Sequence, residues 1–207
     1  MEYRAVGDRC AVDLDDLKLL IQNDDVMAIL KGKGFDALHV DLVRLARECI
    51  RTSLYRRGAR FSEAPSIVDC SSFMKWLYAQ RGVWLPRRSI QQREYGAVVA
   101  LDEVVAGDVV FVSGWIDYFD DDPADGVGHV GIATGEGTVI HAANSSLGVV
   151  ESPLERFIGN GKFRGARRYV PQGREVLTLK TPIGRDIETA NDIKWIVLQS
   201  LPGKGTR

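Results

Sequence analysis

Cysteine is scarce in this sequence, and its spacing argues against the common cysteine frameworks. The chain has three cysteines, Cys10, Cys49 and Cys70, and no Cys-x-x-Cys pair. An odd number of widely spaced cysteines predicts neither a disulfide framework nor a zinc knuckle. We therefore expect reduced thiols.

Net charge and long apolar runs are also lacking. The formal net charge is −1 and the pI is about 6.3, so no overall field attracts nucleic acid or anionic lipid, and no nucleic-acid partner is expected. No apolar run approaches the ~18 residues of a membrane span, and none follows the first charged residues as in a secretory signal. We expect a cytoplasmic protein, or one exported by a route without a signal peptide.

Helical patterns occupy the first part of the 207-residue chain. Residues 14–31 have a helical period broken at Asn23, which fits two short helices as well as one. Leucines recurring toward Cys49 predict an amphipathic helix over 36–55, with Cys49 in the core. Asp69 stands where a helix N-cap belongs, ahead of an apolar helical pattern that ends at Gly82. Cys70 is thus expected in the first turn of a helix.

Short β-type runs with turns between them dominate after Pro86. They are expected to form one antiparallel sheet, and they lie at 98–101, 108–112, 130–134, 138–142, 148–151 and 167–170. A further strand is expected at 176–179 and a helix at 188–201. Helices followed by strands indicate an α+β fold.

Cys70 is the candidate nucleophile, because a helix start and an imidazolium neighbour are the usual means of activating a thiol. Its partner must be His39, His129 or His141, the three histidines of the chain. His39 falls in the predicted helix over 36–55, where a surface or packing role is more common, and it is set aside.

The other two histidines lie in one predicted hairpin, with Gly-Glu-Gly at 135–137 as its loop. That register places His129 opposite Ala143. It also places His141 opposite Gly131. Both rings then share one face of the sheet as diagonal neighbours at ~7–8 Å, within reach of each other. A one-residue shift would put them on opposite faces.

The residues alone leave alternatives open. Cys70 as a small buried side chain, with two ordinary strand histidines, fits the pattern about as well as a catalytic site does. A metal site is disfavoured, because two histidines and one cysteine lack a fourth ligand at a useful spacing.

Five segments, in order along the chain, resemble the motifs of the NlpC/P60 cysteine peptidases of bacterial cell-wall turnover. They read Asp-Cys-Ser-Ser-Phe at 69–73, Leu-Pro-Arg-Arg-Ser-Ile-Gln-Gln at 85–92, Gly-Asp-Val-Val-Phe at 107–111, His-Val-Gly-Ile at 129–132 and Ile-His-Ala at 140–142. The resemblance covers roughly residues 58–170. It implies a papain-like fold with helices packed on a central antiparallel sheet and the nucleophile at a helix N-terminus.

The resemblance also implies a reaction and roles for residues. Cys70 would attack an amide carbonyl to form an acyl-thioester, with His129 as base and then acid. His141 would orient His129, and the backbone N–H of Cys70 would help bind the oxyanion. No cofactor is implied. The family cuts between D-glutamate and a diamino acid in peptidoglycan stem peptides.

Three further residues match positions that border the substrate cleft in relatives, Asp69, Ser71 and Ser89. Helix-capping and turn roles explain them equally well. The substrate would be peptidoglycan fragments or muropeptides. The alternatives are a thiol amidase or acyltransferase acting on a non-wall substrate, and a catalytically silent peptide-binding domain.

The chain departs from the family pattern at three places. Ser72 replaces a glycine and is expected to narrow the approach to the thiol. The family's Tyr-x-x-Gly-Gly segment has its nearest counterpart in residues 58–61, with Phe61 for the tyrosine, although Tyr55 can substitute if the backbone turns back. An acidic stretch at 117–125 is expected to be a solvated loop.

These observations divide the chain into three parts. We expect an N-terminal helical extension at 1–35 and a catalytic domain at 36–170. A C-terminal extension at 171–207 would carry a helix and a mobile tail. Either extension can serve as a surface for a protein partner.

Overall fold

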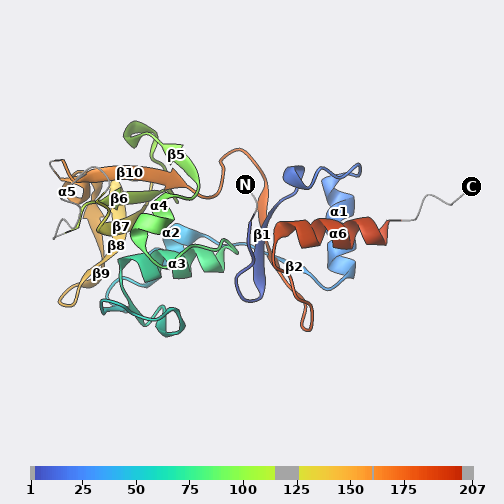
Figure 1. Cartoon of the computed structure of the whole chain (residues 1–207), viewed down its shortest axis with the longest axis horizontal. Helices are drawn as coiled ribbons and strands as arrows, with labels where there is room; N and C mark the ends of the chain where they lie inside the picture. Colours follow the sequence, from blue (N-terminus) through green and yellow to red (C-terminus); the bar gives the residue numbers. More distant parts are fainter. Residues whose placement is uncertain (1–2, 115–125, 160, 202–207) are drawn as a thin grey trace, which may run out of the picture. The chain divides into compact units, whose positions relative to one another are not determined.

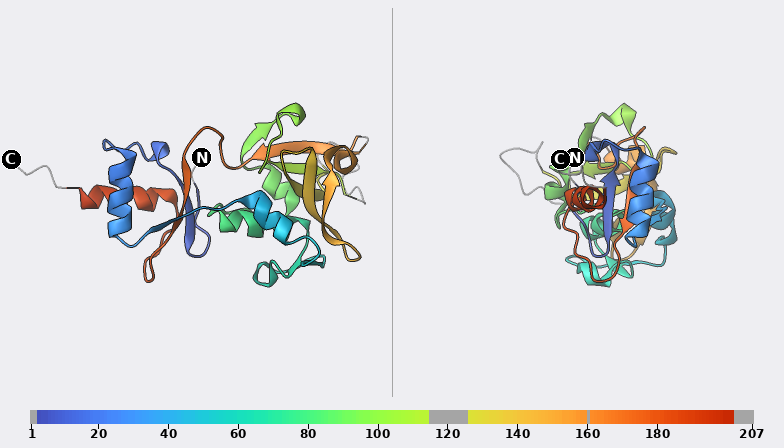
Figure 2. Two further views of the ribbon diagram at one scale, coloured as in Figure 1. Left: turned by 180° about the vertical axis from the view of Figure 1, so that it is seen from behind. Right: turned by 90° about the vertical axis from the view of Figure 1, so that its right-hand side faces the viewer.

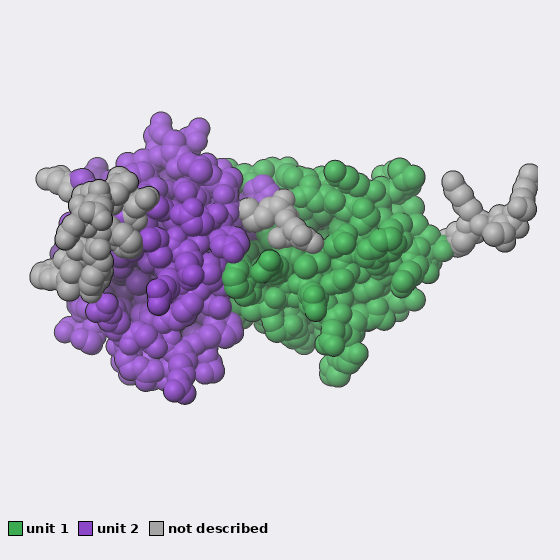
Figure 3. Space-filling model, viewed as in Figure 1, with its two compact units in different colours: residues 1–40, 79–84, 172–207 green, residues 41–78, 85–171 purple. Residues whose placement is uncertain are grey.

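The computed structural model describes residues 3–114, 126–159 and 161–201 (Figure 1). The chain forms two compact units, which Figure 3 colours separately. Unit 1 comprises residues 1–40, 79–84 and 172–207, and unit 2 comprises residues 41–78 and 85–171. In the described part of the chain, no helix has the length and apolar character needed to cross a membrane. The acidic stretch at 117–125 lies outside the described residues.

Unit 2 is built on a six-stranded antiparallel sheet with the strand order β5-β10-β6-β7-β8-β9 (Figures 1 and 2). Its strands are β5 (Ala97–Val99), β6 (Val109–Val112), β7 (His129–Ala133), β8 (Thr138–Asn144), β9 (Gly148–Pro153) and β10 (Phe163–Arg168). These are the six strands predicted between residues 98 and 170. The α+β fold with a central antiparallel sheet is confirmed.

Helices and short elements complete unit 2. They are α2 (Leu42–Glu48), β3 (Leu54–Tyr55), η2 (Phe61–Glu63), β4 (Ile67–Val68), α3 (Cys70–Gln80), α4 (Ser89–Arg93), η3 (Leu101–Glu103) and α5 (Leu154–Ile158). The helix α5 packs on β6, β8 and β9, and α2 packs on β7. The last two residues of α3 belong to unit 1.

The central strands of this sheet are buried on both faces. Val110 and Val112 pack in one cluster with Phe157 of α5. Val109 and Phe111 alternate with them, so they point to the other face, and both are fully buried. A strand buried on both sides reads as a continuous apolar run, which is why 109–112 contains apolar residues only.

Unit 1 joins the two ends of the chain in one three-stranded sheet with the order β1-β11-β2. Its elements are β1 (Arg9–Asp13), η1 (Asp15–Leu17), α1 (Asn23–Gly32), β2 (Asp36–Leu38), β11 (Val176–Lys180) and α6 (Ala190–Ser200). Cys10 and Val12 of β1 pack in one core with residues of α1 and α6. The predicted N-terminal segment therefore contains a strand as well as helices. The three-part division of the chain stays a prediction.

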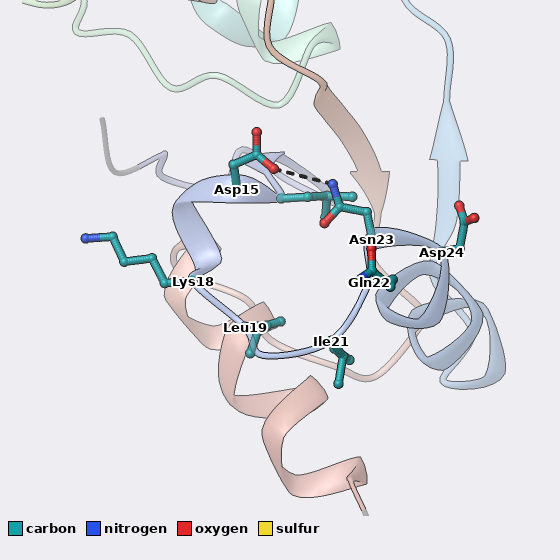
Figure 4. Close-up of a pocket in the computed structure, with 8 residues that line it drawn as sticks. Asp15, Lys18, Leu19, Ile21, Gln22, Asn23 and Asp24 are labelled. Atoms are coloured by element: carbon teal, nitrogen blue, oxygen red, sulfur yellow. Dashed lines mark hydrogen bonds between the residues drawn. The ribbon is translucent and has the colours of Figure 1, made fainter.

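A cavity of about 420 Å³ opens in unit 1 beside η1 and the start of α1 (Figure 4). It is lined by Leu14, Asp15, Lys18, Leu19, Ile21, Gln22, Asn23 and Asp24. Asn23 donates a hydrogen bond to Asp15 across 3.4 Å. Neither a cysteine nor a histidine lines this cavity, so it contains none of the predicted catalytic side chains.

The bounds predicted for a helix over 36–55 are wrong, because a helix forms in only part of this range. Its first residues form β2, which pairs with β11, and the helix α2 begins only after Asp41, whose side chain accepts a hydrogen bond from the N–H of Arg44 at 2.9 Å. The helix ends before Arg51, which has a positive φ of 63°. Pairing with a strand from the far end of the chain outweighs the local helical pattern here. His39 consequently lies in the exposed connection between β2 and α2.

Asp108 joins strand β6 to strand β10. Its carboxylate is almost fully buried and accepts hydrogen bonds from Arg168 at 2.8 Å and 2.7 Å, as well as from the N–H of Val105 at 2.9 Å. Arg168 stands at the end of β10. The pair therefore ties neighbouring strands together where the sheet meets the preceding turn.

We expect Asp108→Ala to lower the free energy of unfolding by about 3 kcal/mol, because it removes the buried carboxylate that accepts hydrogen bonds from Arg168 and from the Val105 amide. Urea denaturation of the full chain measures the change. Arg47→Ala is the control: it removes surface ion pairs with Glu136 and Glu151 and should cost about 1 kcal/mol or less. Equal effects of the two substitutions would contradict the structural role of Asp108.

Candidate functional site

Cys70 is the first residue of α3, as the sequence predicted. The N-cap is Asp69, whose Oδ1 accepts a hydrogen bond from the N–H of Ser72 at 2.8 Å. The Ser72 hydroxyl in turn accepts one from the N–H of Asp69 at 2.8 Å. This reciprocal pairing has the geometry of a capping box, with serine in the place of the usual glutamate or glutamine.

The reciprocal pairing corrects the expectation for Ser72. Its side chain is fully buried and turned back onto the backbone of Asp69. A hydroxyl held there does not stand over the thiol, so it stabilises the helix start and does not narrow the approach to Cys70.

The carboxylate of Asp69 is surrounded by hydrogen-bond donors. Besides Ser72, it accepts hydrogen bonds from Gly58 N–H at 2.9 Å and from both terminal nitrogens of Arg87. Burial raises the pKa of Asp69, but the Arg87 and amide hydrogen bonds outweigh it, and the pKa lies below its ordinary value. Asp69 is therefore a charged acceptor that fixes the loop before α3.

Ser71 and Ser89 occupy different surroundings. Ser71 is buried, and its hydroxyl accepts a hydrogen bond from Arg87 at 2.9 Å. Ser89 is the half-buried first residue of α4. The two helices are tied together by Gln92, whose amide nitrogen donates to the carbonyls of Ser71 and Pro86, each at 2.9 Å.

The thiol of Cys70 lies against the beginning of β7. Burial raises the pKa of Cys70 to about 11, and Asp69 raises it further, while hydrogen bonds from the backbone N–H groups of Ser71 and Val130 oppose the rise. Val130 directly follows His129. The structure therefore brings the thiol to the strand that carries the predicted base.

The two histidines meet as the hairpin register predicted. Ile132 pairs with Ile140 and Ala133 with Val139, so the same register sets His141 opposite Gly131. His129 Nε2 and His141 Nδ1 lie 2.8 Å apart, and the rings are nearly perpendicular at 83°. This contact uses Nε2 of His129, and the ring nitrogen that remains for the thiol is Nδ1.

Neighbouring residues shape the space around the rings. A Cβ added at Gly131 would lie 2.9 Å from the Cβ of His141 and 2.5 Å from a methyl group of Val139, so glycine is needed beside His141. Phe157 packs on both rings, with centroid distances of 5.5 Å to His129 and 4.8 Å to His141. The histidine pair is thereby held in an apolar setting.

That setting disfavours charge on either ring. Burial, and then the neighbouring His141, lower the pKa of His129 to about 3. Burial lowers the pKa of His141 to about 4. Both imidazoles are therefore neutral at pH 7, and a neutral ring can accept a proton from the thiol.

Tyr55, and not Phe61, is the aromatic residue beside the nucleophile. The short strand β3 pairs in parallel with β4, which sets Tyr55 opposite Val68, two residues before Cys70. Burial, followed by the thiol of Cys70 and the carboxylate of Asp69, raises the pKa of Tyr55. Phe61 instead lies 5.7 Å from the ammonium of Lys75 and is 40% exposed.

The choice of residues 58–61 as the counterpart of the family segment was therefore wrong. Residues 55–58 read Tyr-Arg-Arg-Gly, which keeps the spacing of tyrosine and first glycine in that segment. Tyr55 was the alternative that the sequence left open, on condition that the backbone turns back. The loop over 56–66 provides the turn back that the substitution by Tyr55 required.

Arg87 and Ser152 also reach the site, although no role was assigned to them from the sequence. Arg87 binds Asp69, Ser71 and the carbonyl of Ala59, and it could have been found from its place in the 85–92 motif. The hydroxyl of Ser152 lies 3.1 Å from Nε2 of His141. Nothing in the local sequence of β9 distinguishes that serine.

Comparison with known proteins agrees with the fold of unit 2. The model of the NlpC/P60 family matches residues 54–168. A probable endopeptidase of Corynebacterium glutamicum is 41% identical over 92 residues, which cover 44% of this chain and 38% of that protein. The gamma-D-glutamyl-L-lysine dipeptidyl-peptidase of Bacillus cereus is 31% identical over 103 residues, 50% of this chain and 29% of the relative.

A solved structure supports the same relationship. An NlpC/P60 family protein from Bacillus cereus aligns with 63% of this chain and 40% of its own, with a TM-score of 0.53 and 27% identity. The matched segments span less than half the length of each of these three proteins. Unit 1 lies outside the matched segment except for residues 79–84.

The lowered pKa values of the two histidines predict that stability falls with acidification. In the unfolded chain each histidine titrates near its ordinary pKa of about 6.5, whereas in the folded protein His129 and His141 titrate at about 3 and 4. Between these values the unfolded state binds more protons, so the free energy of unfolding decreases as the pH falls from 7 to 4.

Urea midpoints measured from pH 7 to pH 4 test this expectation. In the double variant His129→Gln, His141→Gln, the urea midpoint should decrease less between pH 7 and pH 4, because the two titrating rings are gone. The carboxylates that also respond to acid are the same in both proteins, so they do not contribute to the difference. Identical slopes for the two proteins would contradict it.

Proposed function

This chain belongs to the NlpC/P60 family, and from that premise we propose that it is a cysteine peptidase acting on peptidoglycan stem peptides. The observation that supports the proposal is the hydrogen-bonded pair of His129 and His141 in unit 2. The thiol of Cys70 belongs to the same unit, and the amide of Val130, the residue after His129, is among the groups that lower its pKa.

The proposed reaction begins with Cys70 and His129. The sulfur attacks the amide carbonyl while its proton passes to Nδ1 of His129. Burial opposes an isolated charge on either group, but a thiolate and an imidazolium formed together carry no net charge and offset each other's cost. The imidazolium then donates from Nε2 to Nδ1 of His141, which keeps the ring oriented.

The acyl-enzyme then forms and breaks down in two steps. The tetrahedral intermediate collapses as His129 returns the proton to the leaving amine, and the acyl group stays on sulfur as a thioester. Water next attacks the thioester, losing a proton to His129. The acid product leaves, and the proton on His129 goes back to the thiolate.

Two donors are proposed for the oxyanion. The backbone N–H of Cys70 lies in the first turn of α3, where N–H groups have no acceptor within the helix. The hydroxyl of Tyr55 is the second donor, since the pairing of β3 with β4 sets Tyr55 opposite Val68, two residues before Cys70, and burial together with the neighbouring thiol raises the pKa of Tyr55. Such donors act where negative charge develops in the transition state.

The substrate class is inferred from the named relatives. One is a gamma-D-glutamyl-L-lysine dipeptidyl-peptidase, and we propose the corresponding bond, from D-glutamate to a diamino acid, for this chain. Asp69, Ser71 and Ser89 remain candidates for the substrate cleft. The carboxylate of Asp69 already accepts hydrogen bonds from Ser72, Gly58 and Arg87, which favours the capping role for that residue.

The experiment is incubation of the full chain with purified muropeptides, followed by mass spectrometry of the products. We expect cleavage after D-glutamate, its loss in Cys70→Ala, and a rate about 10²–10⁴-fold lower in His129→Ala. Cys49→Ala makes the same chemical change at a buried thiol in another part of unit 2 and should remain active. Cleavage that persists in Cys70→Ala, or no cleavage by the wild type, would overturn the proposal.

Tyr55→Phe tests the second oxyanion donor. Losing one such donor costs about 10²–10³-fold in kcat, with a smaller change in KM, because the interaction forms in the transition state. The matched control is Tyr95→Phe, which removes the same hydroxyl from a tyrosine that is 42% exposed. An unchanged kcat in Tyr55→Phe would rule out this role.

A further inference from the structure

His141 makes a second hydrogen bond, on the side of its ring away from His129. Its Nδ1 faces His129, and its Nε2 lies 3.1 Å from the hydroxyl oxygen of Ser152 on β9. The three side chains come from adjacent strands of one sheet. They form a continuous line of hydrogen-bonding groups from β7 to β9.

The sheet register explains this line. His141 pairs with Val150, and Ser152 pairs with Val139, so Ser152 is displaced by two residues from the position opposite His141. His129 is displaced by two residues from Gly131, the position opposite His141 on the other side. Residues two apart share a face of the sheet, and diagonal neighbours lie within reach of long or polar side chains. Both neighbours of His141 in the line, His129 and Ser152, are therefore diagonal to it by two residues.

The proton positions along this line depend on one another. When His129 carries the proton from the thiol, both of its ring nitrogens are donors, so Nδ1 of His141 must accept. A neutral imidazole with an accepting Nδ1 carries its proton on Nε2. That proton points to Ser152, whose hydroxyl oxygen is an acceptor at the right distance.

The opposite tautomer would work against the reaction. If His141 carried its proton on Nδ1, it would donate to Nε2 of His129, and neutral His129 would then hold its own proton on Nδ1. That nitrogen could not take a proton from the thiol. The tautomer of His141 therefore decides whether His129 can act as a base.

We propose that Ser152 is a positioning residue that holds neutral His141 in the Nε2–H tautomer and thereby keeps Nε2 of His129 a donor and its Nδ1 the proton acceptor. This inference rests on the proposed roles of Cys70 and His129. The surroundings support it: His141 is only 9% exposed, and α5 packs on β8 and β9 with Phe157 against the ring.

Ser152→Ala removes the acceptor, and Ser152→Thr keeps the hydroxyl. We expect kcat on muropeptides to fall about tenfold in the alanine variant with KM unchanged, and to be restored in the threonine variant. Ser146→Ala is the matched control, because it makes the same change in an exposed turn of unit 2. An unchanged kcat in Ser152→Ala would overturn the inference.

A second measurement reads the tautomer directly. Long-range ¹H–¹⁵N correlation spectra distinguish Nδ1–H from Nε2–H, and the chain has only three histidines to assign. The wild type should show His141 as Nε2–H, and Ser152→Ala should show a mixture of tautomers. The same tautomer in both proteins would contradict the proposal.

The two measurements separate this inference from the proposed function. If the wild type cleaves no muropeptide, the peptidase proposal fails, whereas a tautomer change in Ser152→Ala still supports the role of Ser152. If the wild type cleaves and Ser152→Ala is indistinguishable from it in kcat and in tautomer, the role of Ser152 fails and the peptidase proposal stands.

Discussion

The pairing of β7 with β8 is the constraint on which the candidate site depends. It places His129 and His141 on one face of the sheet with ring nitrogens 2.8 Å apart. A slip by one residue would send one ring to the opposite face and leave a polar group among the apolar side chains there. The register is held by the short loop at 135–137, where Gly135 and Gly137 both have positive φ, and by the absence of a side chain at Gly131.

A second constraint acts on the nucleophile. Asp69 caps α3 through Ser72, and Arg87 fastens the same carboxylate to the following segment of chain. The helix start, the loop containing Gly58 and the turn before α4 are thus fixed to one charged group. The position of the thiol at the helix start is thereby fixed relative to both of these segments.

The apolar setting of the site has two opposing effects. It lowers the pKa values of both histidines and raises that of Cys70, so it disfavours each charge alone. It also strengthens every hydrogen bond within the site, because the local dielectric is low. A line of groups that exchange protons without accumulating net charge suits such surroundings, and the proposed proton path from Cys70 through His129 and His141 to Ser152 would have that character.

The sequence by itself determined the parts of this protein that depend on local or short-range patterns. Short β-type runs separated by turns located the six strands of unit 2, the Gly-Glu-Gly loop set the histidine register, and Asp69 marked the beginning of α3. In each case the controlling residues lie within a few positions of the feature they control. The order of the five motifs along the chain also indicated the NlpC/P60 family.

Tertiary structure decided what depends on residues far apart in the chain. Residues 36–38 became a strand because β11, more than a hundred residues later, pairs with them. Tyr55 reached Cys70 because β3 and β4 pair in parallel, and Ser152 reached His141 through a diagonal step between strands. A periodic pattern reports which face of an element is apolar, but it does not report which distant element will cover that face or which polar groups will meet there.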